Sequence, residues 1–246
     1  FKQAYRPLLP GIKHIHYGSF SDLQKITRQT AAVIIETVQG EAGVRVACTT
    51  YFKALRQRCD ETGTLLILDE IQTGFGRTGS FWAFTVHDIV PDIVVCAKGM
   101  GGGLPIGAFI ASAGLMQHLK QQPVLGHIST FGGNAVCCAA ALATLEVVQS
   151  GILPKIAHLE NVFWQRLKHP LIKELRSKGL LMALELGSNE LVLEFIQRAL
   201  SKGLVTDWFL FCDTALRLAP PLIIDEGVAH EACDIILAVL DDMAAI

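Results

Sequence analysis

The sequence predicts an α/β protein, with a mostly parallel sheet in a larger first domain and a smaller α/β domain after it. Apolar runs at residues 31–36, 65–69 and 92–96 are continuous, which is typical of parallel strands covered by helices on both faces. Of the 246 residues, 51% are hydrophobic and 18% are charged, so the chain can form a large core. A change of pattern near residue 151 indicates the second domain.

The first domain is expected to alternate further strands and helices. Helical spacing over residues 49–62 ends at Gly63, a typical C-cap residue. A fourth strand is expected at 106–111. Asn134 is a favourable N-cap for a long helix at 134–149.

Gly151 and Pro154 mark the change of pattern, so we place the domains at residues 1–150 and 151–246. The second domain is expected to hold, in order, a helix at 152–168, a strand at 180–186, a helix at 190–201, a short strand at 216–218 and a final helix at 226–243. This order predicts a small sheet with helices packed on it.

The charge balance argues against nucleic acid or a membrane as a partner. Lys and Arg number 21 and Asp and Glu number 23, so a net charge of −2 provides no attraction to phosphate groups. Segment 99–145 contains Lys120 as its only charged residue, but its nine glycines and two prolines would break a bilayer helix. We expect this segment to be buried against a core, a subunit interface or a ligand.

The chain has seven cysteines, at positions 48, 59, 96, 137, 138, 212 and 233, and none forms a CxxC pair. An odd number in mostly apolar surroundings indicates reduced, buried thiols rather than a disulfide framework. This usage is typical of a cytoplasmic protein, and we expect no metal site.

Two charged residues follow predicted parallel strands, whose carboxyl ends meet at one edge of a sheet. Asp69 ends one strand, and Lys98 lies between another strand and the glycine-rich turn 99–103. A lysine in such a setting is expected to be poorly solvated, which favours the neutral amine that attacks a carbonyl. A lysine Schiff base with an aspartate for the pyridinium nitrogen is typical of pyridoxal phosphate sites. Taken singly, Asp69 can instead cap the next turn, and Lys98 can be a surface residue beside a loop.

Seven sequence blocks extend this pattern along the chain: QGEAG at 39–43, LDEIQTGFGRTG at 68–79, PDI at 91–93, AKG at 97–99, GGLPIGA at 102–108, STFGGN at 129–134 and LRLAPPL at 216–222. In their residues, order and spacing they resemble the class III, fold type I aminotransferases. The acetylornithine and ornithine aminotransferases are the most similar subgroup. The resemblance implies a partial large domain followed by the C-terminal small domain.

The resemblance also implies a role for each cofactor-site residue. Lys98 would form the internal aldimine with pyridoxal 5'-phosphate and move the proton during catalysis. Asp69 would pair with the pyridinium nitrogen, and Gln72 would hydrogen-bond the phenolic oxygen. Ser129 and Thr130 would reach the cofactor phosphate of the neighbouring subunit, which implies a homodimer with shared sites.

Glu41 and Arg217 match the switchable pair of these enzymes. By the resemblance, Arg217 would bind the α-carboxylate of one substrate, because Arg offers a rigid two-pronged donor, and Glu41 would mask it for the other. The implied reaction moves an amino group between an amino acid such as (acetyl)ornithine and 2-oxoglutarate.

The chain departs from the family pattern in two places. Thr37 follows the strand glutamate where these enzymes commonly have Pro, which we expect to alter a turn and not the chemistry. The match also begins beyond the family's glycine-rich phosphate cradle. We therefore expect the 246-residue chain to bind pyridoxal phosphate weakly and to show little transamination.

Three alternatives stay open. A 4-aminobutyrate aminotransferase would share most of these motifs, and an inactive fragment or structural subunit would retain them. A nicotinamide-dependent dehydrogenase would use the GxGxxG at 74–79, but residues 70–73 separate it from the strand and 80–84 lack a helical stripe.

Overall fold

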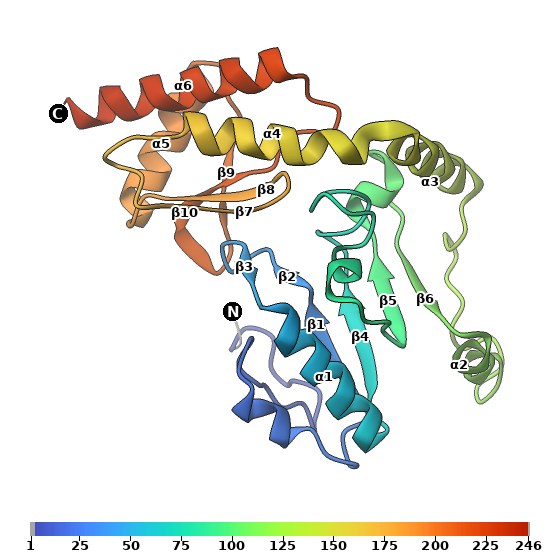
Figure 1. The fold of residues 1–246 in the computed structure, drawn as a ribbon. Helices are drawn as coiled ribbons and strands as arrows, with labels where there is room; N and C mark the ends of the chain where they lie inside the picture. The colour runs from blue at the N-terminus through green and yellow to red at the C-terminus, as the bar shows by residue number, and fades with distance from the viewer. Residues whose placement is uncertain (1–2, 246) are drawn as a thin grey trace.

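The computed structural model describes residues 3–245 and contains two four-stranded sheets joined by a long helical run (Figure 1). The first sheet has the order β1-β4-β5-β6. Its strands are β1 (Ala32–Glu36), β4 (Leu65–Asp69), β5 (Ile93–Cys96) and β6 (Ala108–Ala111). β1, β4 and β5 are parallel, and β6 runs antiparallel to β5. The four predicted strands and the mostly parallel sheet are confirmed.

Helix α1 (Thr49–Thr62) covers one face of this sheet. Its Phe52 packs with Leu66 and Leu68 of β4, and all three side chains are fully buried. Gly63 ends the helix in the left-handed conformation, as the sequence predicts. The prediction that both faces are covered is wrong for this chain: Ile34, whose side chain points to the other face, is 67% exposed.

The helical run consists of α3 (Ala135–Val147), the π-helical turn η5 (Val148–Ile152) and α4 (Leu153–Arg166). Asn134 caps it, because its side chain accepts hydrogen bonds from two backbone N–H groups of the first turn. Short helices complete this half: η1 (Ser21–Lys25), η2 (Ala83–His87), η3 (Lys98–Gly101), α2 (Ala113–Gln117) and η4 (His118–Lys120).

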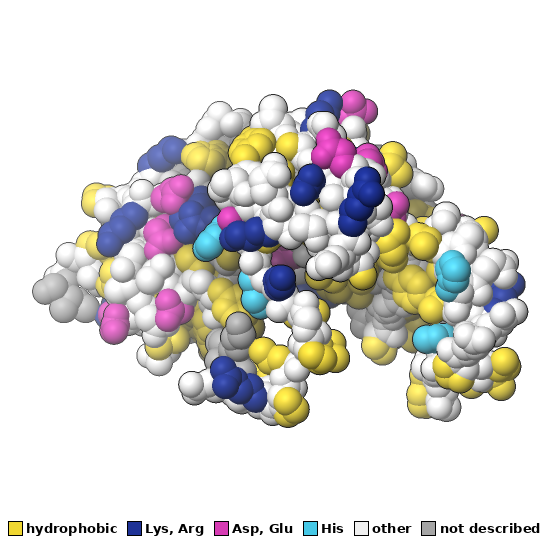
Figure 2. All heavy atoms as spheres, turned by 90° about the horizontal axis from the view of Figure 1, so that it is seen from below, with side chains coloured by type: hydrophobic (Ala, Val, Ile, Leu, Met, Phe, Trp, Pro, Cys, Tyr) yellow, Lys and Arg dark blue, Asp and Glu magenta, His cyan; other side chains and the backbone are white. Residues whose placement is uncertain are grey.

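By length and composition alone, residues 135–166 could cross a membrane. Gly151 interrupts the run with a φ of 120°, and α4 packs Ile156 and Phe163 into the core of the second domain. Only 6% of the most apolar window in this run is buried, and Val136, Leu142 and Val147 of α3 are exposed. Figure 2 shows hydrophobic side chains gathered in the hollowed part of the face seen from below.

The second sheet is antiparallel, with the order β7-β8-β10-β9. Its strands are β7 (Glu174–Lys178), β8 (Leu181–Glu185), β9 (Asp207–Phe209) and β10 (Cys212–Leu218), and α4, α5 (Asn189–Ser201) and α6 (Glu226–Ala244) form its core with it. The predicted helices and the strands near 180–186 and 216–218 are confirmed. β7 and β9 are additional strands, and β10 is longer than predicted, because pairing with their neighbours supplies order that their sequences do not show.

The excursion between β1 and α1 connects the two halves. It contains the hairpin of β2 (Val38–Gln39) and β3 (Arg45–Val46). Val38 and Val44 of this excursion are buried in one cluster with Ala183 and Phe209 of the second sheet. In sequence, the hairpin therefore lies between β1 and β4 of the first sheet, but it packs on the second sheet.

All seven cysteines are free, but the prediction that they are buried is wrong for four of them. Cys59, Cys96 and Cys233 are buried, and the other four are partly or fully exposed. Cys137 and Cys138 lie on α3, whose apolar surface has little cover in this chain.

Candidate active site

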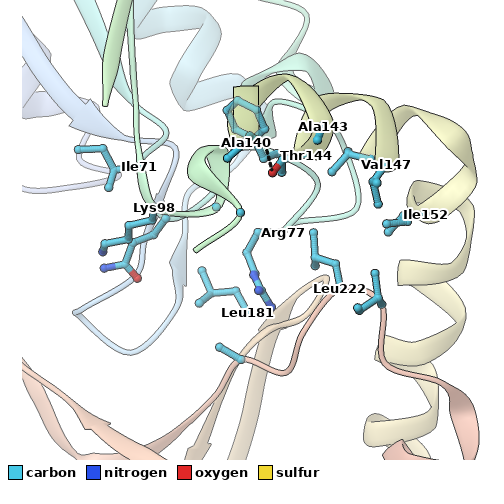
Figure 3. A pocket seen from close by; sticks show the side chains of 18 of the residues that line it. Ile71, Arg77, Lys98, Ala140, Ala143, Thr144, Val147, Ile152, Leu181 and Leu222 are labelled. Atoms are coloured by element: carbon cyan, nitrogen blue, oxygen red, sulfur yellow. Dashed lines mark hydrogen bonds between the residues drawn. The ribbon is translucent and has the colours of Figure 1, made fainter. Parts of the chain in front are cut away.

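A cavity of about 710 Å³ lies where the two domains meet. Figure 3 shows α3 as one wall, with Ala140, Ala143, Thr144 and Val147, and Leu181 and Leu222 of the second domain on the opposite side. Lys98, Gln72 and Arg217 line the same cavity. The structure thus brings three of the predicted site residues to one space.

Lys98 follows β5 and opens the turn η3. Its backbone φ is 44°, a value that non-glycine residues rarely adopt and that indicates strain of the kind found at functional sites. The prediction that Lys98 is poorly solvated is wrong for this chain, because the residue is exposed although it lines the cavity.

Asp69 lies at the carboxyl end of β4, one strand away from Lys98. Its Oδ1 accepts a hydrogen bond from the Ile71 N–H at 2.9 Å, as in a capped turn. Within residues 3–245, its Oδ2 accepts none and is left for another donor. Asp69 is not among the residues that line the cavity in this chain.

Glu36 ends the neighbouring strand β1, and the charges of nearby side chains affect its pKa. Burial raises the pKa of Glu36, and the carboxylates of Asp69 and Glu41 raise it further, while Lys98 and a hydrogen bond from the Gly40 N–H oppose the rise. The Asp69, Glu41 and Lys98 side chains therefore all influence the ionisation of Glu36.

Glu41 connects Gln72 to Arg217. Its Oε1 accepts hydrogen bonds from Gln72 Nε2 at 2.8 Å and from Arg217 Nη1 at 3.0 Å, and its Oε2 accepts one from the Leu210 N–H at 2.9 Å. Burial opposes ionisation of Glu41, but these donors outweigh it and hold its pKa below the ordinary value. The predicted pair is therefore formed and charged at neutral pH.

Arg217 lies on β10, and its surroundings add further contacts. Its guanidinium lies 5.6 Å from the centre of the Phe209 ring, and its Nη2 lies 3.6 Å from Asp207 Oδ2. Such a two-pronged cation facing a cavity is suited to bind a carboxylate.

Ser129 and Thr130 are not brought to this cavity. Both are exposed, in the loop between η4 and α3. In residues 3–245 they contribute to no site formed by this chain alone.

Sequence reasoning missed Glu70, although it follows Asp69 directly. Its carboxylate is 1% exposed and accepts four hydrogen bonds, from the hydroxyls of Thr37 and Thr73 and from the N–H groups of Ala83 and Phe84. This network fixes the loop that carries Gln72. The signal for it was Thr37, the residue that departs from the family's Pro.

Arg77 was also missed, and it joins the two domains. Its Nη1 donates to the carbonyl oxygens of Leu180 at 3.0 Å and Pro220 at 2.7 Å. Burial lowers its pKa to about 10. A nucleotide-binding glycine loop would open a helix. Residues 71–82, which include the GxGxxG match, form turns and no helix, so they do not fit such a loop.

Comparisons with known proteins show what the chain is similar to. The class-III aminotransferase family model matches residues 12–240. The acetylornithine aminotransferase of Methanopyrus kandleri is 39% identical over 94% of this chain and 59% of its own length. The putrescine aminotransferase of Pectobacterium atrosepticum is 39% identical over 99% of this chain and 54% of its own length.

Solved structures agree as well. An ornithine aminotransferase from Toxoplasma gondii superposes with a TM-score of 0.86 at 33% identity, over 98% of this chain and 59% of that one. Ornithine δ-aminotransferase of Plasmodium falciparum gives 0.84 at 31% identity, over 96% and 62%. The chain spans 54–62% of the length of these four proteins.

We predict that Thr37→Val lowers the free energy of unfolding by about 1–3 kcal/mol, because the buried Glu70 carboxylate loses a donor without a change of side-chain shape. Urea denaturation measures the change. Thr27→Val is the matched control: Thr27 is exposed, and a shift within about 0.5 kcal/mol is expected. Equal shifts for the two variants would show that the Thr37 hydroxyl contributes nothing to the network.

Proposed function

The chain belongs to the class-III aminotransferase family, and we propose that it forms part of a pyridoxal-phosphate-dependent aminotransferase that exchanges an amino group between a terminal amine and 2-oxoglutarate. The observation that carries the proposal is the hydrogen-bonded chain Gln72–Glu41–Arg217 beside the cavity that Lys98 lines. It combines an amine that can attack a carbonyl with a maskable site for a carboxylate.

The residues present fit pyridoxal phosphate. Lys98 offers a primary amine, Asp69 offers the carboxylate oxygen that no described residue uses, and Gln72 offers an amide at the cavity wall. Bound pyridoxal phosphate would supply an electron sink for negative charge at the substrate carbon.

Each side chain then has a defined task. Lys98 Nζ moves a proton between the substrate carbon and the cofactor side, and its strained backbone holds the amine at the cavity. The Asp69 carboxylate would hold the cofactor by accepting a hydrogen bond from its ring nitrogen, and its negative charge would favour the protonated form of that nitrogen. The Gln72 amide binds an oxygen on the ring while it also holds Glu41.

The Glu41–Arg217 pair allows one site to accept two kinds of substrate. A terminal amine has no carboxylate on its reacting carbon, so without Glu41 the nearest anionic partner of Arg217 would be Asp207, 3.6 Å from its Nη2; Glu41, at 3.0 Å from Nη1, neutralises the charge more closely. Glutamate and 2-oxoglutarate carry a carboxylate at that carbon, which replaces Glu41 on Arg217. The pKa of Glu41 below its ordinary value keeps the mask charged at neutral pH.

The preferred donor is proposed from the relatives. Acetylornithine and putrescine, named for two of them, share a terminal amine on an unbranched carbon. We place (acetyl)ornithine first and 4-aminobutyrate second, because all present such an amine. We also place the protein in the cytoplasm, where its free cysteines stay reduced.

We predict that Lys98 is the lysine that holds the cofactor. Borohydride reduction of the loaded protein, followed by peptide mapping, should place the pyridoxyl label on Lys98, and Lys98→Ala should abolish both label and transamination. Lys120 is the control, since it is exposed in segment 99–145 but lines no described part of the cavity. A label on Lys120 would overturn the assignment.

We predict that Arg217→Lys lowers kcat/KM for 2-oxoglutarate by roughly tenfold or more, because Lys keeps the charge but loses the two-pronged geometry. Steady-state kinetics on both half-reactions measure it, and the terminal-amine half-reaction should change less. Unchanged kcat/KM in both half-reactions contradicts the role.

We propose that two copies associate through the apolar surface that includes α3. Phe131 is 82% and Val136 68% exposed, and such contiguous apolar surface is typical of interfaces. Ser129 and Thr130 would then face the neighbouring site. Light scattering should give a dimer, and Val136→Glu should weaken it; a monomer that keeps full cofactor affinity would rule the proposal out.

A further inference from the structure

We infer that Arg176 is a positioning residue for the carboxylate mask: it clamps the loop that carries Glu41 onto the second domain, so that Glu41 stays opposite Arg217. The inference rests on the proposed roles of Glu41 and Arg217. Arg176 touches neither substrate nor cofactor and acts through the loop.

The contacts of Arg176 show the clamp. Its side chain is 9% exposed, and its Nε donates to the Gly43 carbonyl oxygen at 2.7 Å. Its Nη2 pairs with Glu185 at 2.9 Å, and its Nη1 pairs with Glu174. Two carboxylates of the second sheet thus bind the two terminal nitrogens of the guanidinium, and the third nitrogen, Nε, binds the loop.

The loop lies directly on that sheet at Gly43. A Cβ at this position would lie 2.7 Å from Cys212 Sγ and 3.0 Å from Arg176 Nη2, and Gly43 has a φ of +83°. Only glycine allows both the approach and the conformation. Because the loop backbone at Gly43 contacts the second sheet directly, the Gly43 carbonyl oxygen lies within hydrogen-bonding distance of Arg176 Nε.

The strand connection after β9 holds the loop from the other side. The Phe211 N–H donates to the Glu41 carbonyl oxygen at 3.0 Å, and the Leu210 N–H donates to the Glu41 carboxylate at 2.9 Å. With the Val38 and Val44 cluster, these contacts make the loop part of the second domain. Glu41 and Arg217 are then held together on the second domain, and the Glu41–Gln72 hydrogen bond joins them to the domain that carries Lys98.

Loss of Arg176 should free the loop and so unmask Arg217. Glutamate, with a carboxylate on its reacting carbon, should gain from the exposed cation. A terminal-amine donor such as ornithine should lose, because its own carboxylate can bind Arg217 in a reversed, unproductive orientation. The ratio of kcat/KM for ornithine to that for glutamate should fall by about tenfold, the factor expected from one charge-assisted hydrogen bond.

The first experiment needs no cofactor and no turnover. Amide hydrogen exchange of Val44, whose N–H donates to Gly40, should be about tenfold faster in Arg176→Met than in the unmodified protein. Arg198→Met is the matched control, because Arg198 pairs with Glu194 on α5 and should leave this amide unchanged. Arg176→Lys, which keeps the charge in the sheet, serves if the Met variant fails to fold. An unchanged rate in the folded Arg176 variant overturns the clamp.

The second experiment separates positioning from general stability. Arg176→Lys, Glu41→Gln and the double variant are compared by the ornithine-to-glutamate ratio in the loaded enzyme. If Arg176 acts through Glu41, its substitution should change nothing further in the Glu41→Gln background; additive effects would overturn the inference. If the complete enzyme of which this chain forms part transaminates neither substrate, the proposed function fails, while the exchange experiment still decides the clamp.

Discussion

The attachment of the Glu41 loop to the second domain is the constraint on which the site depends. The loop leaves the first sheet after β1 and returns at α1, so it is an excursion of the first domain that is bonded to Arg217, Leu210, Phe211 and Arg176. Both ends of the excursion are fixed by β1 and α1. The second domain is therefore held at a defined distance from the sheet edge that carries Asp69 and Lys98.

Two glutamates close to this edge, Glu70 and Glu41, differ in burial and in their partners, and this difference decides whether a ligand could take their place. Glu70 is almost inaccessible and is satisfied by four neutral donors, so no ligand can replace any of them. Glu41 shares its charge with Arg217, which lines the cavity. In the proposed function a substrate carboxylate would replace Glu41 on Arg217, because the cation then exchanges one anionic partner for another.

Elements whose signal is local could be predicted from the sequence, and elements that depend on distant partners could not. Continuous apolar runs and the cap at Gly63 located β1, β4, β5 and α1. β7 reads ELRSK and is a strand only because it pairs with β8. Motif spacing found Lys98, Glu41 and Arg217, but the clamp joins Arg176 to a residue 133 positions away, which no local pattern contains.

The exposure of Lys98 and that of α3 have one physical origin. Helix α3 is apolar on nearly every side, and such a helix needs cover on every side. In this chain it packs against the turn η3, and a Cβ at Gly102 would lie 2.3 Å from Thr144 Oγ1 of α3. The turn that begins at Lys98 therefore packs on a helix that has no buried residue in this chain. In the proposed dimer, a partner surface over α3 would cover the outer side of the helix that forms one wall of the cavity. The apolar character of segment 99–145 therefore belongs to the environment of Lys98 as well as to the proposed dimer interface, although Lys98 itself is exposed in this chain.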